Sequence, residues 1–432
     1  MNSEDPTGAA PLPRLAALRY RDFRLLWAGQ LISQVGSQMQ LATVNWHIYS
    51  LLQGADVQVT LFGHTVPLGA EALGLGTLGL VRFVPIVVFA LVGGVLADTR
   101  DRRRLMLWTQ SAAALFAGLL AWETLSGRDS VLVIYLLTSA GAAAAAFDNP
   151  ARQALVPNLV PRAALSNAVS LNTLLFQIGS VVGPTVAGLL VARFNVGLIY
   201  AVDALSFLAV VSALLLMHYR GRPAATDTGL GWQAMLEGLR FTYRSHIIWG
   251  TMLLDFFATF FSSARTMLPI IASDVLGVGP VGYGVLSTAQ SVGAIVAGAV
   301  IALRREIHKQ GVVLLASVAI YGLVTMLFGI ATTFILSYFL FALTGAADTV
   351  STVIRGTIRQ VITPDHLRGR MTSVNMIFFM GGPQLGELES GLVGAAWGVP
   401  FAIFAGGLAT IVLTGWVAWR YPKLRAYESK TA

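Results

Sequence analysis

The sequence contains no cysteine, and it carries little charge for its length of 432 residues. Without cysteine, disulfide frameworks and thiolate chemistry are excluded. Charged residues make up 12% of the chain, against roughly 25% in soluble domains, which is too few to cover the surface of a soluble enzyme. Phosphate-cradling loops, metal-ligand clusters and nucleophilic triads are also absent from the sequence, so we expect no cofactor, no metal and no enzyme activity.

Hydrophobic residues make up 55% of the chain, and the mean hydropathy is +0.70. The apolar runs are too continuous for an outer-membrane barrel, whose strands alternate. A spanning helix needs about 20 apolar residues, and the sequence predicts an all-α polytopic membrane protein with twelve such spans. They cover residues 23–52, 74–97, 105–125, 131–151, 165–192, 196–217, 246–274, 282–303, 311–331, 333–354, 370–396 and 399–420.

The positions of the cationic residues predict which side of the membrane each gap faces. Of 29 Lys and Arg residues, 25 fall in alternate gaps or at the two termini. The remaining gaps hold only Arg128 and Arg193, and Arg82 and Arg265 lie inside spans. Cationic loops stay on the cytoplasmic side. We therefore expect both termini in the cytoplasm, and the net charge of +8 does not indicate a nucleic-acid partner.

An offset of 203 residues superposes the second half of the chain on the first. Arg, Pro, Ser, Asn and Gly residues coincide at seven places, namely 152/355, 161/364, 170/373, 172/375, 179/382, 183/386 and 188/391. Glycine is common in spanning helices, which is the alternative explanation. The repeat predicts two pseudo-symmetric six-helix halves, as in alternating-access transporters. The expected parts are residues 1–22, 23–217, a linker 218–245 with an amphipathic helix, 246–420 and 421–432.

Polar residues recur at helical spacing in the first, fifth and seventh spans. Polar groups inside a membrane are costly and usually face the bundle interior, so we expect the three stripes to line a substrate cavity shared by the two halves. The alternative is that they hold helices together by hydrogen bonds. The candidate cavity residues are Gln30, Gln34, Gln38, Asn45, Gln177 and Thr259.

Three carboxylates inside the spans are candidates for proton coupling: Asp255, Glu387 and Glu389. A carboxyl group whose solvent access alternates can exchange between its protonated and charged forms. The alternative is a permanent ion pair, for example of Glu387 or Glu389 with Arg82 or Arg265. His47 is either a proton acceptor or a hydrogen-bonded structural residue.

The loop after the second span, residues 93–104, combines Gly94 and Asp98 with a run of arginines. It resembles the signature loop of the major facilitator superfamily, although Thr99 and Asp101 replace the expected Arg and Gly. Residues 21–33, 148–153, 200–207, 236–241 and 386–391 look like the drug:proton antiporter-3 branch, which includes macrolide and enterobactin exporters. The resemblance implies an inner gate formed by Gly94, Asp98, Arg102, Arg103, Asp148 and Arg152.

The resemblance also implies the function. We expect a monomeric secondary transporter of the cytoplasmic membrane that exports small amphipathic molecules, of the drug or siderophore class, by proton antiport. The fourth span has no Arg between Tyr135 and Ala146, where many drug antiporters carry one. A proton relay through that residue is therefore not transferred. The alternative is a lipid or lysolipid carrier, or a flippase, of the same fold.

Overall fold

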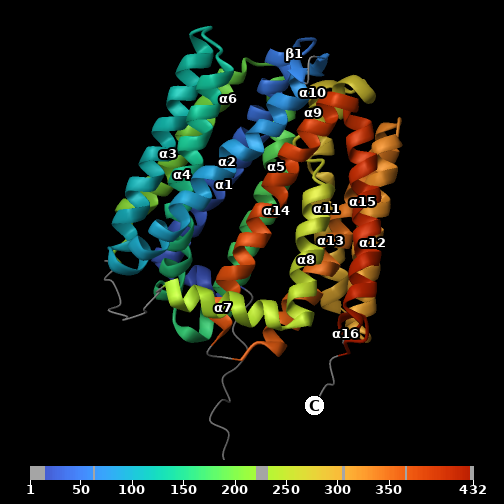
Figure 1. Cartoon of the computed structure of the whole chain (residues 1–432). Helices are drawn as coiled ribbons and strands as arrows, with labels where there is room; N and C mark the ends of the chain where they lie inside the picture. Colours follow the sequence, from blue (N-terminus) through green and yellow to red (C-terminus); the bar gives the residue numbers. More distant parts are fainter. Residues whose placement is uncertain (1–14, 62–63, 220–231, 304–306, 365–366, 429–432) are drawn as a thin grey trace, which may run out of the picture.

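The computed structural model describes residues 15–61, 64–219, 232–303, 307–364 and 367–428. Long helices run side by side along one common direction (Figure 1). A small β-hairpin lies at one end of the bundle, which we call the hairpin end, at the top of the figure. The opposite end carries the short helices α7 and α16, and we call it the α7 end.

The first part of the chain forms six long helices. A short helix, η1 (Ala16–Arg19), precedes them, and two more, η2 (Val156–Asn158) and η3 (Arg162–Ala164), join the fourth to the fifth. The six are α1 (Arg21–Leu52), α2 (Ala70–Thr99), α3 (Arg102–Leu125), α4 (Val131–Leu155), α5 (Leu165–Val191) and α6 (Val196–Leu216).

The second part begins with α7 (Trp232–Arg244), within the linker where an amphipathic helix is expected. The helices that follow are α8 (His246–Phe261), α9 (Leu268–Ile270), the π-helical turn η4 (Ile271–Val275), α10 (Gly279–Leu286), α11 (Ala289–Leu303), α12 (Gln310–Ile330), α13 (Phe334–Ile362), α14 (Arg368–Trp397), α15 (Val399–Arg420) and α16 (Pro422–Arg425).

Within the described residues, nine segments are long and apolar enough to cross a membrane. Helices α1, α8 and α14 pack in the same bundle but are not among the nine. Helices α1 and α14 carry several Gln, Ser and Glu residues, and α8 has only 16 residues. Large apolar side chains such as Leu303 and Ile335 are 87% and 83% exposed, as expected of a lipid-facing surface. The twelve-span count stays a prediction.

Three predicted spans differ from the observed helices. The span 246–274 is interrupted after Phe261 and resumes at Leu268, and the span 282–303 breaks between α10 and α11. Helix α13 continues to Ile362, so Arg355 and Arg359 are buried helical residues rather than part of a cytoplasmic loop. The cause at Arg355 is an ion pair with a carboxylate on another helix, which lets a cation lie inside the bundle.

The β-hairpin was not expected from the sequence. Strand β1 (Asp56–Leu61) pairs antiparallel with β2 (His64–Gly69), with Asp56 opposite Gly69 and Leu61 opposite His64. The alternation of Val57, Val59 and Leu61 with polar residues is a strand signal. A prediction based on apolar runs of about 20 residues does not detect strands of six residues.

The helix starts follow the 203-residue repeat. Helices α4 and α13 begin at residues 131 and 334, α5 and α14 at 165 and 368, and α6 and α15 at 196 and 399. Each pair differs by 203. These boundaries depend on backbone hydrogen bonding rather than on the residue types that first indicated the repeat, so they support it independently.

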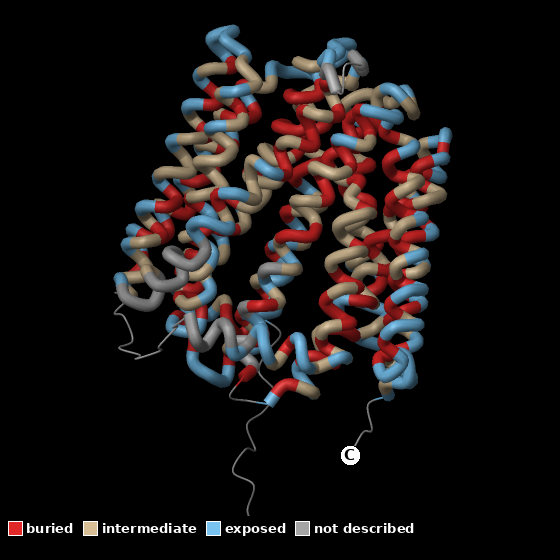
Figure 2. Tube along the Cα trace, in the orientation of Figure 1, coloured by how far each residue is buried: buried red, intermediate tan, exposed pale blue. Residues whose placement is uncertain are grey.

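Buried apolar residues form one cluster at the hairpin end and separate clusters at the α7 end. The hairpin-end cluster joins both parts of the chain, with Ile48 and Leu75 beside Leu268 and Phe328. At the α7 end one cluster contains only residues from 17 to 217, and another only residues from 254 to 424. Figure 2 shows the buried stretches gathering toward the hairpin end. The two halves therefore share a core at one end and have their own cores at the other.

Candidate functional site

A cavity of about 350 Å³ lies among the first six helices. Residues of α1, α3 and α4 form most of its wall, with Arg82 from α2, Phe176 from α5 and Phe207 from α6. Its volume is within the range of roughly 300–1,000 Å³ typical of small-molecule sites. Every lining residue that the structure describes falls between 30 and 207. This cavity therefore includes no described residue of α8, and the predicted wall shared by the first- and seventh-helix stripes stays a prediction.

The predicted cavity residues are divided among several places. Gln30 and Gln34 line the large cavity. Gln38 and Asn45 line a smaller pocket of about 10 Å³ together with Arg265 and Tyr283. Gln177 and Thr259 line neither. The Thr259 hydroxyl donates to the carbonyl oxygen of Asp255 at 2.8 Å, so it serves the local structure of α8.

A polar network occupies one wall of the large cavity. The carboxylate of Asp148 accepts hydrogen bonds from Thr109 at 3.0 Å and from Gln110 at 2.9 Å. One turn along α4, Arg152 donates to Oε1 of Gln30 at 2.9 Å, and its Nε lies 3.9 Å from Asp148. Two buried amide atoms, Nε2 of Gln30 and Oε1 of Gln110, have no hydrogen-bond partner. The wall therefore presents one free donor and one free acceptor.

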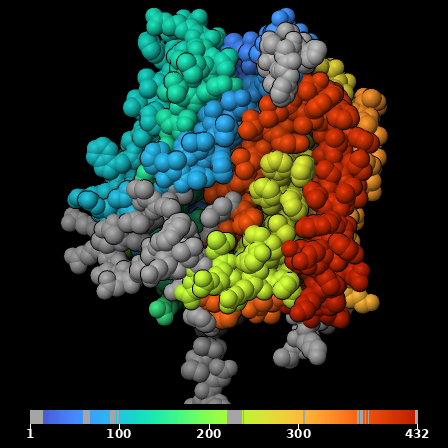
Figure 3. All heavy atoms as spheres, viewed as in Figure 1, coloured from blue at the N-terminus to red at the C-terminus, as the bar shows by residue number. Residues whose placement is uncertain are grey.

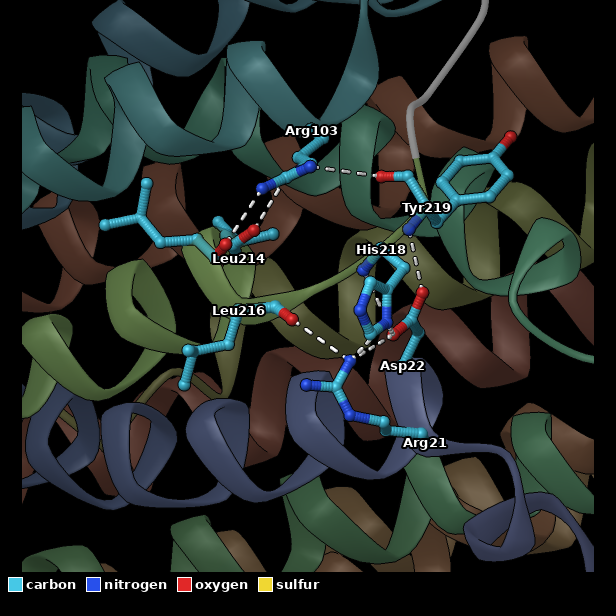
Figure 4. Close-up of polar contacts among 8 residues, drawn as sticks. Arg21, Asp22, Arg103, Leu214, Leu216, His218 and Tyr219 are labelled. Atoms are coloured by element: carbon cyan, nitrogen blue, oxygen red, sulfur yellow. Dashed lines mark hydrogen bonds and ion pairs between the residues drawn. The ribbon is translucent and has the colours of Figure 1, made fainter.

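The residues predicted to form an inner gate make contacts within the first half. Arg103 donates to the carbonyl oxygens of Leu214 and Leu215 at 2.6 and 3.1 Å, and so caps the end of α6 (Figure 4). Arg102 donates to the carbonyl of Ala154 at 3.2 Å. Asp148 and Arg152 belong to the cavity wall described above. The side chains of Gly94 and Asp98 lie outside the described residues.

Next to Arg103, the chain that leaves α6 is held by the start of α1. The carboxylate of Asp22 accepts hydrogen bonds from the backbone N–H groups of His218 and Tyr219, the latter at 2.8 Å. Arg21 donates to the carbonyl of Leu216 at 3.1 Å (Figure 4). Helices α1 and α3 together therefore fix the direction in which the linker departs from the first half.

A second charged cluster is buried in the other half. Nη1 of Arg355 on α13 lies 3.0 Å from the Asp255 carboxylate on α8, and both side chains are only 2% exposed. Nη2 of the same arginine is 3.5 Å from Asp348 and donates to Thr352 at 2.9 Å. The geometry thus favours the structural, ion-pair interpretation of Asp255, for which the sequence indicated no partner, and Arg355 is that partner.

Glu387 lies between the two halves, where α14 packs against α2. A methyl group placed on Gly79 of α2 would come within 3.0 Å of Oε2 of Glu387, and this oxygen is buried without a hydrogen-bond partner. Arg82 and Arg265 both act electrostatically on the carboxylate, but no ion pair within 4.0 Å is found among the described side chains. Glu389, by contrast, is half-buried, and it accepts a hydrogen bond of 3.5 Å from Ser390.

Close glycine contacts join the halves near the hairpin end. A methyl group on Gly391 of α14 would lie 2.5 Å from the Cα atom of Gly76 on α2, and one on Gly188 of α5 would lie 2.7 Å from that of Gly284 on α10. Only glycine allows backbones to approach this closely. Figure 3 shows α2 against α14 on this face of the molecule.

Two polar contacts at the hairpin end were not predicted. The hydroxyl of Tyr49 donates to Asp274 at 2.5 Å, and that of Tyr283 donates to the carbonyl of Ala42 at 2.9 Å. Both join α1 to the second half. His47 lies nearby, 3.4 Å from Asp129 and 3.1 Å from the Tyr200 hydroxyl, so it is a hydrogen-bonded buried residue. A tyrosine near a helix end indicates that its hydroxyl has a polar partner. The sequence does not show which partner, because the two residues are far apart along the chain.

Comparison with known proteins places this arrangement in a family. A family model described as a transmembrane secretion effector matches residues 12–432. The enterobactin exporter EntS of Shigella boydii serotype 18 is 28% identical over 328 residues, which cover 75% of this chain and 77% of that protein.

Solved structures show the same fold at low identity. A bacterial homologue of the human lysosomal transporter Spinster, in an inward-facing and occupied conformation, gives a TM-score of 0.72 at 13% identity, covering 98% of this chain and 100% of that one. A POT peptide transporter mutant in complex with sulfate gives 0.73 at 12%, covering 94% and 96%. These structures show the fold, and the family match over residues 12–432 confirms the superfamily indicated by residues 93–104. The chain belongs to the transmembrane secretion effector family of the major facilitator superfamily, and it is a multi-pass membrane transporter rather than an enzyme.

Proposed function

We propose that the protein exports small amphipathic molecules of the siderophore or drug class across the cytoplasmic membrane by alternating access, in exchange for protons and as a monomer. The observation that carries the proposal is the division of the apolar core. In alternating access the two halves stay in contact at one end of the bundle while they separate at the other. A core shared at the hairpin end and separate cores at the α7 end match this requirement. With both termini in the cytoplasm, the α7 end is the cytoplasmic side.

The cavity supports the substrate class. It combines apolar wall residues, among them Phe116 and Phe207, with the Asp148–Arg152 network and unpartnered amide groups. A wall of this mixed kind binds molecules that have both a ring or hydrocarbon surface and hydrogen-bonding groups. The similarity to enterobactin exporters supports a siderophore as the first compound to test.

We assign the coupled proton to Glu387. In the present structure Oε2 of this residue is buried against Gly79 without a hydrogen-bond partner, and such burial disfavours the charged form of a carboxyl group. Separation of α2 from α14 at the hairpin end would admit water and allow ionisation. A proton from outside would then be needed before the two helices close again. Asp255, in contrast, has Arg355 as a permanent counter-ion and is proposed to be structural.

Efflux from inverted or reconstituted vesicles tests the proposal. The purified protein is reconstituted in liposomes, and uptake or release of enterobactin is measured with a pH gradient imposed in either direction and with a protonophore. We expect gradient-dependent transport in the wild type and in Glu428→Gln, which changes an exposed acid in the tail. Glu387→Gln should lose the gradient dependence, and Glu389→Gln should keep it.

Two outcomes would contradict the proposal. Gradient-dependent transport that survives in Glu387→Gln removes the proton assignment but not the carrier function. Movement of a fluorescent lysophospholipid between leaflets in the same liposomes, without enterobactin or drug transport, identifies a lipid carrier instead and overturns the export function.

A further inference from the structure

The cavity region holds more arginine than acid. Arg82 and Arg152 line the large cavity, and Arg265 lines the small pocket beside it. Among the described residues, Asp148 is the acid that lines these cavities and Glu387 is the acid that acts electrostatically on Arg82 and Arg265. Even with both acids ionised, one positive charge is left over, and a second is left over when Glu387 is neutral. Uncompensated charge in a membrane interior is costly, so such sites usually bind an opposite charge.

In the large cavity the excess charge lies at Arg82, because Arg82 and Arg265 share Glu387 and Arg265 lines the small pocket rather than the large cavity. Arg152 already has Asp148 at 3.9 Å as its counter-ion. Arg82, by contrast, makes one hydrogen bond, from Nη2 to Oδ1 of Asn45 at 3.1 Å, and none of the ion pairs between described residues includes it. It is the twelfth residue after Ala70, so it lies about 18 Å along α2, near the middle of the membrane. Arg82 therefore lines the cavity with no carboxylate within ion-pair distance among the described residues, and the acid that acts on it electrostatically, Glu387, is shared with Arg265.

The other wall residues indicate which chemical groups a bound anion would carry besides its negative charge. Phe116, Phe176 and Phe207 contribute aromatic surface. Gln30 and Gln110 are 5% and 6% exposed, and each has one amide atom directed to no protein partner. A ligand that has a ring, a negative oxygen and a further hydroxyl group, which both donates and accepts, would satisfy all of these groups together.

We propose that the cavity inside the first half is a binding site for an anionic aromatic molecule, whose carboxylate or phenolate oxygen pairs with Arg82. That this molecule is transported rests on the proposed export function. That it binds in the cavity does not. A guanidinium group can donate two parallel hydrogen bonds to such an oxygen pair, which gives both strength and orientation. Arg82 is thus the specificity-determining residue, and Asp148 with Arg152 forms a neutral wall.

Two probes that share a ring but differ in charge test this assignment. Binding of 1-pyrenebutyrate and of 1-pyrenebutyltrimethylammonium is measured by equilibrium dialysis against the full-length protein in nanodiscs, with binding to empty nanodiscs subtracted. We expect the wild type to bind the anion at least about tenfold more tightly than the cation, which corresponds to about 1.4 kcal/mol. Arg82→Lys should retain most of that preference, and Arg82→Gln should lose it.

Control variants separate charge from folding and from ring contacts. Arg193→Gln removes an exposed arginine at the hairpin end and should leave both affinities unchanged. Phe116→Leu should weaken both probes by a similar factor, because it removes ring contact from each. Thermal unfolding of every variant identifies any that fail to fold, and Arg82→Lys provides the charge test if Arg82→Gln is one of them.

Equal binding of the two probes, or tighter binding of the cation, would overturn the proposed ligand class. The same holds if Arg82→Gln keeps the preference for the anion. Failure of the export function is seen separately: anion binding that depends on Arg82, combined with no movement of enterobactin or of 1-pyrenebutyrate in liposomes, leaves the binding site standing and removes the transport proposal.

Discussion

Arg152 and Arg355 occupy equivalent positions in the two halves, yet their surroundings differ. Each donates to the residue three positions earlier on its own helix, Asn149 at 2.5 Å and Thr352 at 2.9 Å. Each also reaches the first long helix of its own half. Arg152 binds an amide, Gln30, whereas Arg355 binds the carboxylate of Asp255 at 3.0 Å.

The difference shows how one repeat can be adapted to two tasks. In the first half the partner on α1 is neutral, the side chain of Arg152 is 12% exposed, and a cavity of about 350 Å³ adjoins it. In the second half the pair is charged and only 2% exposed. An amide can exchange its partner for water or ligand at little cost, whereas a buried charge pair cannot. The first half is therefore suited to ligand binding and the second to rigid support.

The largest effect is expected from Arg355→Ala. Removal of the cation leaves Asp255 buried without a counter-ion, and breaking a buried pair in this way costs about 3–5 kcal/mol. Thermal unfolding of the purified protein should show a much lower midpoint, with Arg193→Ala as the control. An equal loss in Arg152→Ala would contradict the distinction between the two halves.

Gly391→Val should affect both stability and transport. The added side chain meets Gly76 on α2, where a Cβ atom would be 2.5 Å from the Cα atom, and overpacking of this kind costs about 1–3 kcal/mol. We expect transport to fall at least about tenfold, as estimated from that cost. Gly298→Val, which meets no atom within 4 Å, is the matched control.

The same variant tests whether the hairpin end closes. A cysteine introduced at Asn45, which lines the small pocket, should react faster with a membrane-impermeant maleimide in Gly391→Val than in the unaltered background. The reagent is added to the membrane side that the hairpin faces. Equal labelling rates would show that the α2–α14 contact does not control access.

Arg152→Gln should reduce transport more than stability. The lost contacts to Gln30 and Asp148 border a cavity, so we expect a cost of about 1–2 kcal/mol in unfolding free energy. Substrate efflux should fall roughly tenfold, since one hydrogen bond to a charged group has that order of effect. Arg355→Gln is the comparison. If it folds normally and only transport is lost, the proposed division of roles is wrong.

The smallest effect is expected from the contacts that the two halves share. Asn149→Ala removes an exposed hydrogen bond to Arg152 and Thr352→Ala a partly buried one to Arg355, and each bond contributes about 0.5–1.5 kcal/mol. Unfolding midpoints should fall by similar small amounts in both variants. A large loss in one of them alone would show that the two positions are not equivalent.

The helices themselves were largely predictable, because hydropathy reports directly on lipid exposure. The repeat was visible through Gly, Pro and Arg residues, and the helix starts follow the same offset. The local sequence pattern does not predict the position of a residue when a partner distant in the sequence determines it. Arg355 was assigned to a cytoplasmic gap because its partner Asp255 lies 100 positions earlier in the sequence.

The polar stripes are visible in the sequence, but the sequence does not show which cavity each of their residues lines. Gln30 and Gln38 lie on the same helix yet line different cavities, since helix rotation and packing decide which neighbour each side chain meets. The break after Phe261 was missed for a related reason. The apolar pattern continues through it, and Arg265 sits in the interrupted stretch.

The constant spacing of three successive helix starts also bears on ancestry and engineering. Because α4, α5 and α6 begin at the same intervals as α13, α14 and α15, α4 and α5, each together with the turn that follows it, have the same number of residues as their counterparts. We therefore expect that the two triplets can be exchanged without altering the spacing of the helix starts, which offers a route to chimaeras in which each arginine faces the partner helix of the other half.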